Sequence, residues 1–174
     1  MYGRVRHYVI ILVLASTQFV RSQTTRPSQI QGKDVEVSLP PGWEYNQVLL
    51  QRGGPIALTN FRGEYLHGGL LPPKGAEIEI TSVPRPIQLA DYASSELRGV
   101  RQLKLQEIAI NGRPTLRVSY VDDVADRISM ENVVYYVPQG LRLYKFYMTF
   151  GSGDTHQRQL AQTLETIVRQ AVLK

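Results

Sequence analysis

The sequence predicts an α+β domain in which a mainly antiparallel sheet packs against helices. Three observations lead to this fold class. Several segments alternate polar and apolar residues at period two, which is typical of strands with one buried face. Short turn sequences such as Asn111-Gly112 join many of these segments in pairs, which indicates antiparallel hairpins. Two further segments, 88–98 and 159–172, carry apolar residues at helical spacing.

In the first half of the chain, turn-forming residues separate several extended segments. Pro40-Pro41-Gly42 and Gly53-Gly54-Pro55 each force a turn. The strands predicted around these turns are 34–39, 43–51, 56–61 and 76–83. Between the last two strands, residues 62–75 include four glycines and two prolines, too many for a helix or a long strand. This segment is therefore predicted to be the longest irregular loop.

The second half of the chain begins with the helix over 88–98, for which Gly99 is the expected C-terminal stop. The Asn111-Gly112 pair predicts a hairpin of strands 105–110 and 115–121. A longer hairpin is expected from two strands rich in Val, Tyr and Phe, 128–137 and 141–150. Because apolar residues occupy both alternating sets in these two strands, we expect them at the centre of the sheet.

A final helix is predicted to follow Gly151-Ser-Gly-Asp-Thr155, with Asp154 or Thr155 as its N-cap. Its buried face is expected to consist of Leu160, Leu164, Ile167 and Ala171. In the strand before it, alternation places Phe146 and its apolar neighbours on one side of the sheet and Tyr147 on the other. Aromatic residues left uncovered on either side would mark a protein-binding surface.

The N-terminal residues 1–22 have the pattern of a secretory signal peptide. Arg4 and Arg6 precede an apolar core over 8–15, and small or aliphatic residues precede a cleavage point after Ser22. The apolar core is about half the roughly 20 residues that a membrane-spanning helix needs. We therefore expect an exported protein, periplasmic or extracellular, without an integral membrane segment after cleavage. Residues 23–32 are predicted to be a disordered lead-in, and 33–174 a single domain.

The charge and the cysteine content exclude several classes of function. The chain carries a formal charge of +5, but three of its basic residues lie in the predicted signal peptide, which leaves 17 Lys and Arg against 15 Asp and Glu. These residues are dispersed, so nucleic acid is not an expected partner. The chain has no cysteine, which excludes disulfides, thiolate nucleophiles and zinc–thiolate sites.

The sequence offers little material for catalysis. After signal cleavage only two histidines, His67 and His156, would remain, and no nucleophile elbow, zinc-protease helix or phosphate loop is present. Glu77 and Glu79 lie on one face of a predicted strand, and Asp122, Asp123 and Asp126 form a second acidic group. We interpret both groups as solvated faces and predict no enzyme activity, no metal and no cofactor.

The order of elements resembles that of the PsbP-like family, named after the extrinsic oxygen-evolving subunit of photosystem II. The resemblance rests on Val35-Glu-Val-Ser-Leu-Pro-Pro-Gly-Trp43, the Asn111-Gly112 hairpin, and the 135–150 hairpin that leads into the helix over 159–172. The fold of this family is shared with a yeast Ran-binding nuclear-import factor. The resemblance implies an α/β/α sandwich of PsbP-like type, used mostly for binding or assembly rather than catalysis.

The candidate binding residues are Glu64, Tyr65 and His67 in the 62–75 loop, together with Glu77 on the following strand. Our leading hypothesis is an exported, non-enzymatic binding or assembly module of the cell envelope or secreted fraction. Its expected partner is an unidentified protein, bound by the loop and adjacent strand edges. The alternative is a small-ligand-binding protein or a hydrolase with a pocket under the same loop. The oligomeric state is left open.

Overall fold

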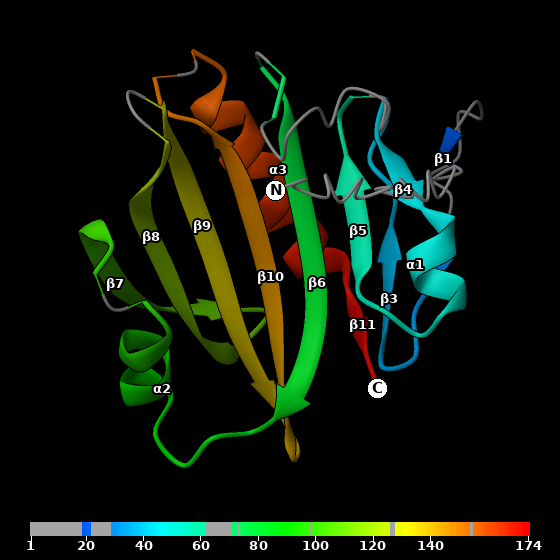
Figure 1. Ribbon diagram of the computed structural model, residues 1–174. Coiled ribbons are helices and arrows are strands. Elements are labelled where there is room, and N and C mark those ends of the chain that lie inside the picture. Colours follow the sequence, from blue (N-terminus) through cyan, green and yellow to red (C-terminus); the bar gives the residue numbers. More distant parts are fainter. Residues whose placement is uncertain are drawn as a thin grey trace, which may run out of the picture.

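In the computed structural model, the larger part of the chain forms two antiparallel sheets and three helices (Figure 1). The described residues are 19–21, 29–61, 71–72, 74–97, 99–125, 128–153 and 155–174. The eight-stranded sheet has, in spatial order, β1 (Phe19–Arg21), β4 (Glu44–Asn46), β5 (Ile56–Thr59), β6 (Ala76–Pro84), β10 (Arg142–Gly151), β9 (Ile128–Gln139), β8 (Arg113–Ala125) and β7 (Arg101–Ile110). The second sheet consists of β11 (Val172–Leu173), β3 (Val35–Ser38) and β2 (Gln29–Gln31). The helices are α1 (Gln47–Gln51), α2 (Leu89–Glu96) and α3 (Gln157–Gln170).

The two predicted hairpins are confirmed. β9 and β10 pair continuously from Arg142 opposite Gln139 to Gly151 opposite Met130, and they lie in the middle of the large sheet as expected. The β7–β8 hairpin turns at Asn111 and Gly112, whose φ angles are 52° and 76°. Positive φ at both central residues is the geometry that favours an Asn-Gly pair in a two-residue hairpin turn.

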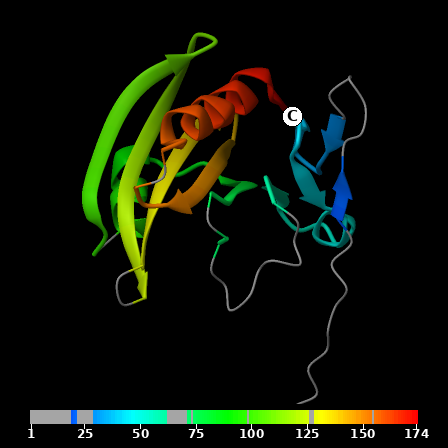
Figure 2. The same ribbon diagram turned by 90° about the horizontal axis from the view of Figure 1, so that it is seen from above.

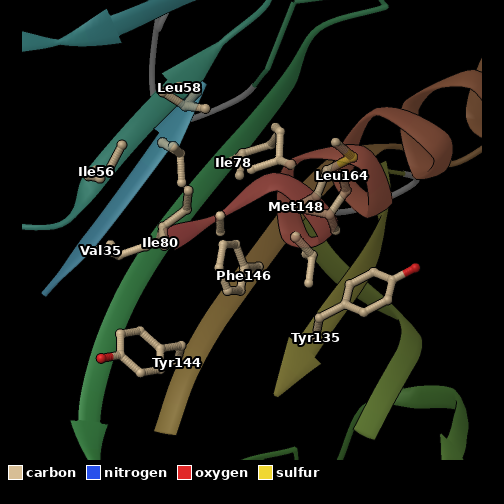
Figure 3. Close-up of a cluster of buried hydrophobic side chains, with 14 of the residues drawn as sticks. Val35, Ile56, Leu58, Ile78, Ile80, Tyr135, Tyr144, Phe146, Met148 and Leu164 are labelled. Atoms are coloured by element: carbon tan, nitrogen blue, oxygen red, sulfur yellow. The ribbon is translucent and has the colours of Figure 1, made fainter. Parts of the chain in front are cut away.

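One face of the large sheet packs against α3 and the smaller sheet (Figures 1 and 2). The predicted buried residues of α3, among them Leu160, Leu164 and Ile167, lie in this core. In Figure 3, Leu164 lies against Met148, with Phe146 and Tyr135 further along the same layer. This explains why every second residue of the central strands is apolar on this side, because these side chains are all removed from water.

The opposite face of the sheet packs against α2. Ala93 of this helix is fully buried in a second cluster with Val118, Val134 and Leu143. Gly99, the predicted stop of this helix, has φ +86°, and the helix ends three residues before it, at Glu96. Helices on both faces make the α/β/α arrangement, so the predicted α+β fold class is confirmed.

The predicted strand over 43–51 is only partly correct. β4 ends at Asn46, and the chain continues as the short helix α1. The side chain of Asn46 caps this helix, because its Oδ1 atom accepts a hydrogen bond from the backbone amide of Leu49 at 3.0 Å. A five-residue helix has too few residues to show a helical pattern, so local capping decides its structure.

The beginning of the chain and the start of α3 also differ from expectation. Gln29–Gln31, within the segment expected to be disordered, forms β2, where Ile30 is only 2% exposed and pairs with Val37 of β3. β2 is ordered by its pairing with β3, and the sequence of β2 alone gives no sign of this pairing. Residues Phe19–Arg21, within the predicted signal peptide, pair with β4.

His156, not Thr155, occupies the N-cap of α3, while Asp154 lies outside the described residues. No helix in the described part of the chain is long and apolar enough to cross a membrane.

Candidate functional site

Three of the four candidate residues, Glu64, Tyr65 and His67 of the 62–75 loop, lie outside the described residues. The two ends of the region are described, and Asn60 joins them. Its Oδ1 atom accepts a hydrogen bond from the amide of Ala76 at 2.7 Å, and its Nδ2 atom donates to the carbonyl of Lys74 at 3.2 Å. The chain therefore leaves the sheet and returns to it at one point, immediately before Glu77.

Glu77, the fourth candidate, lies in a row of polar residues that crosses the large sheet. On β6 it is in register with Thr59 of β5 and Thr149 of β10. Thr149 in turn faces Asn132 of β9, which faces Tyr120 of β8. Because residues in register point to the same face, five strands contribute one polar side chain each to a single line.

The next row along the same face adds Glu79 of β6 opposite Tyr147 of β10. Both rows lie on the α2 side of the sheet. Tyr120 and Tyr147 pack against the edge of the α2 cluster, whose buried members, such as Leu143, lie nearer the other end of the sheet. In Figure 1, α2 lies low beside β8, and the helix seen next to the upper part of β10 is α3, which packs on the opposite face of the sheet. We call these two rows the polar half-face; it consists of Glu77, Glu79, Tyr120, Tyr147 and Thr149, which are partly exposed, and of Thr59 and Asn132, which are buried beneath them.

Hydrogen bonds fix the orientation of Tyr147 on the polar half-face. The hydroxyl of Tyr147 donates to Oδ1 of Asn132 at 2.6 Å, and Nδ2 of this buried asparagine donates to the carbonyl of Met130 at 3.3 Å. Tyr120 lies close enough to Tyr147 for the two phenols to affect each other's pKa. Burial raises the pKa of both phenols above the usual value. Both therefore remain neutral hydrogen-bonding groups at physiological pH.

The two glutamates of the polar half-face are acidic groups with no counterion among the described residues. Neither Glu77 nor Glu79 has a side-chain hydrogen bond or an ion pair to the rest of the described chain. Partial burial, and then the charge of Glu79, raise the pKa of the Glu77 carboxyl. This arrangement favours either a bound proton or a bound cationic group at Glu77.

Lys145, two residues before Tyr147 on β10, does not pair with the glutamates, because it is paired with Glu96. Its Nζ atom donates to Glu96 of α2 at 2.8 Å, and the hydroxyl of Tyr136 donates to the same carboxylate at 3.1 Å. Burial opposes ionisation of Glu96, but the hydrogen bonds from Lys145 and Tyr92 outweigh it and lower the pKa of this carboxyl. This network, which we call the α2 latch, holds the end of α2 on the sheet.

The other acidic residues are held in a different way. Asp123 accepts hydrogen bonds from Arg101 and from Ser129, the latter at 2.6 Å, and Asp126 lies outside the described residues. Among the described residues, no group of three or more His, Asp or Glu side chains is placed to hold a metal ion.

Comparisons with known proteins identify the fold. No protein-family model matches the sequence, and no curated protein matches it significantly. Among solved structures, the Ran-binding protein Mog1p of Saccharomyces cerevisiae matches with a TM-score of 0.57 and 14% identity over 86% of this chain and 96% of that protein. LpqN of Mycobacterium tuberculosis, described as involved in cell envelope biogenesis, matches with a TM-score of 0.53 and 10% identity over 90% of each chain. Cyanobacterial PsbP from Synechocystis matches with a TM-score of 0.49 and 13% identity over 87% of this chain and 94% of that protein.

The expected PsbP-like type of fold is confirmed, and the structures of Mog1p and LpqN carry this conclusion. At these identities the likeness concerns the fold alone, so no functional residue is transferred.

The sequence located only one part of the polar half-face. Glu77 was identified as a candidate, and alternation correctly placed Tyr147 on the side opposite Phe146. Asn132, Thr149 and Tyr120 were not identified as site residues. They come from three strands, and only the register between the strands shows that they form one row with Glu77.

Proposed function

We propose that this protein is an exported, non-enzymatic binding module, periplasmic or extracellular, that holds a partner protein on the polar half-face and the adjacent 62–75 loop. The observation that carries the proposal is the pair of carboxylates, Glu77 and Glu79, which have no ion pair among the described residues and lie on the same face as Tyr120 and the hydrogen-bonded Tyr147. Carboxylates flanked by oriented tyrosines are suited to a lysine or arginine side chain of a partner.

The form of the surface supports a protein partner rather than a nucleotide or an anion. The partly exposed residues of the polar half-face come from three strands, β6, β8 and β10, so the contact area is spread over the sheet. Tyrosine is enriched in the buried centres of protein interfaces, because it combines a large apolar ring with a hydrogen-bonding hydroxyl. The negative charge of Glu77 and Glu79 disfavours phosphate or carboxylate ligands.

The fold is compatible with this role. Mog1p is a Ran-binding protein by name, and LpqN is described as involved in cell envelope biogenesis. The same layered architecture therefore occurs in a protein that binds another protein. This is an analogy between folds, and the binding role of the present chain rests on its own surface.

One observation favours the alternative of a small-ligand-binding protein or hydrolase. Partial burial raises the pKa of Glu77, and such carboxyls are used as general acids or bases. The other groups of the polar half-face are neutral hydroxyls and an amide, so a reaction would have to use Glu77 with residues of the 62–75 loop. A small molecule found in the purified protein by native mass spectrometry would support this alternative.

The test of the binding role is affinity capture of partners from the envelope and secreted fractions of the host, with quantification by mass spectrometry. We expect Glu77→Lys to reduce capture of the specific partner at least about tenfold, since it places a like charge against the cationic group. Combined alanine substitutions at Glu64, Tyr65 and His67 test the loop in the same way. Gln162→Lys, on the exposed side of α3, is the matched control and should leave capture unchanged.

If Glu77→Lys and the control capture equal amounts of every partner, the binding site lies elsewhere.

Export has its own test, namely N-terminal sequencing of the protein recovered from the host. The proposal predicts a mature chain that begins at Gln23 in the envelope or the medium. An N-terminus at Met1 in the cytoplasm would contradict it.

A further inference from the structure

The end of the molecule away from the polar half-face carries two unusually exposed aliphatic side chains. Ile87 is fully exposed and Leu141 is 91% exposed. They lie on the β6–α2 connection and the β9–β10 turn, which together form the lower end of the molecule in Figure 1. The two segments are joined, because the amide of Arg85 donates to the carbonyl of Leu141 at 2.9 Å. Ile87 follows Arg85 by two residues, so it and Leu141 lie on two segments that this hydrogen bond holds together; we call this pair of exposed side chains the apolar projection.

An apolar hollow lies directly beside this projection. It has a volume of about 520 Å³ between α2, the β7–β8 hairpin and the end of β9. Arg85 lines it and also bonds to the turn that carries Leu141, so the hollow and the projection are contiguous. The apolar lining consists of Leu89, Ala90, Ile108, Pro114, Leu116 and Pro138.

Two charged residues of opposite sign also line the hollow. Arg85 contributes a guanidinium whose only hydrogen bond within the described chain is a long one, 3.5 Å, to the carbonyl of Gly140. Glu107 of β7 is exposed and has no ion pair among the described residues. The same surface thus combines a projection, a hollow, and a cation and an anion that form no ion pair among the described residues.

We propose that a second copy of this chain docks on this surface as a twofold-symmetric dimer. In such a dimer each patch meets an identical patch, so the patch must be complementary to itself. Ile87 and Leu141 of each copy enter the hollow of the other. Arg85 of each copy pairs with Glu107 of the partner subunit, and the two ion pairs are equivalent by symmetry.

The charge pattern favours a second copy over a lipid surface. An anionic membrane would be recognised by a group of cations around the apolar projection, and the exposed carboxylate of Glu107 would be repelled from it. Prolines near the surface restrict the backbone of both segments, so little conformational freedom is lost on docking. They are Pro84 and Pro86 in the first segment and Pro138 beside the second.

The first experiment measures the molecular mass of the purified protein over a wide concentration range by analytical ultracentrifugation. We expect a reversible monomer–dimer equilibrium. Ile87→Asp and Leu141→Asp should each raise the dissociation constant about tenfold or more, because a charge would enter an apolar hollow. Both positions are exposed in the monomer, so thermal unfolding of the variants should match that of the wild type. Ile128→Asp, at the opposite end of β9, is the control and should leave dimerisation unchanged.

A charge exchange tests the twofold geometry. Arg85→Glu and Glu107→Arg should each weaken the homodimer, because each places like charges together. A mixture of the two variants should form a heterodimer, since both of its ion pairs then join opposite charges. The double variant should recover the wild-type dissociation constant.

A protein that stays monomeric at all concentrations would overturn the proposal, as would a dimer insensitive to Ile87→Asp and Leu141→Asp. Failure of the charge exchange to restore dimers would overturn the twofold pairing. Binding to anionic vesicles that Ile87→Asp abolishes, without dimerisation, would assign the projection to a membrane instead. None of these outcomes bears on the polar half-face, which lies at the other end of the sheet.

Discussion

The two faces of the eight-stranded sheet are built by the same strands but differ in what covers them. On the α3 side, β10 contributes Phe146 and Met148 to a core that is closed to water. On the other side, the same strand contributes Tyr147 and Thr149 to the polar half-face. One set of side chains stabilises the fold, while its neighbours one position away remain available to a partner. Alternation along a strand therefore separates stability from binding.

The lengths of the two helices account for the difference in how much of each face is covered. α3 has 14 residues and is about 21 Å long, whereas α2 has eight residues and is about 12 Å long. A strand such as β10, with ten residues, extends about 33 Å. α2 can therefore cover only part of the face on which it lies, and the remaining part must be polar enough to contact water or a partner.

The largest expected effect is the removal of a core side chain on the α3 side. Phe146→Ala should lower the free energy of unfolding by about 3–5 kcal/mol, since Phe146 is fully buried. Tyr147→Phe, the adjacent position on the other face, should cost only about 1 kcal/mol because it removes a hydroxyl and keeps the ring. Urea denaturation of both variants measures the contrast. Equal losses would mean that the two faces contribute alike to stability.

A smaller effect is expected from the α2 latch. Glu96→Gln should lower stability by about 1 kcal/mol at neutral pH, since the side chain is 28% exposed and receives charge-assisted hydrogen bonds.

The latch also predicts a pH dependence. Because the folded-state pKa of Glu96 is lowered, its contribution is complete above the ordinary value of 4.5 and is lost as the pH falls through the folded pKa. The stability difference between wild type and Glu96→Gln should therefore shrink in acid. A difference that is constant with pH would show that the charge of Glu96 is not responsible.

On the polar half-face we expect a change of the opposite sign. The raised pKa of Glu77 means that its charged form is less favourable in the folded than in the unfolded state. Glu77→Gln should therefore increase stability at pH 7, by up to about 1 kcal/mol. The gain should vanish as the pH falls below the unfolded-state pKa, where both proteins carry a neutral group. A loss of stability at pH 7 would show that Glu77 supports the fold.

The smallest effect is expected on the outer surface of α3. Glu165 and Arg169 form an exposed i,i+4 ion pair on this helix. Glu165→Gln should change the free energy of unfolding by no more than about 0.5 kcal/mol, and added salt should reduce the change further. A loss of unfolding free energy several times larger would indicate that the outer side of α3 contributes to stability as much as its buried side.

Most of the fold could be predicted from the sequence because its larger elements carry their own patterns. The Asn111-Gly112 turn fixed a hairpin, and the spacing of Leu160, Leu164 and Ile167 fixed the buried side of α3. The short elements could not be predicted. β2 and β11 have three and two residues and owe their structure to pairing with β3.

The candidate site was less accessible to sequence reasoning. Glu77 was found because its own strand alternates, but the row through Thr149, Asn132 and Tyr120 depends on how four strands are aligned. Register between strands that are distant in sequence follows from packing and turn geometry, and no residue pattern in one strand reports it.

The most direct test of the polar half-face is site-specific photocrosslinking in the host. A photoreactive amino acid is placed at Thr149, in the middle of the polar row, or at Gln162, on the exposed side of α3. Our account predicts a discrete crosslinked product with a partner protein from position 149 and none from position 162. The same product from both positions, or a product from position 162 alone, would contradict the assignment of the binding surface.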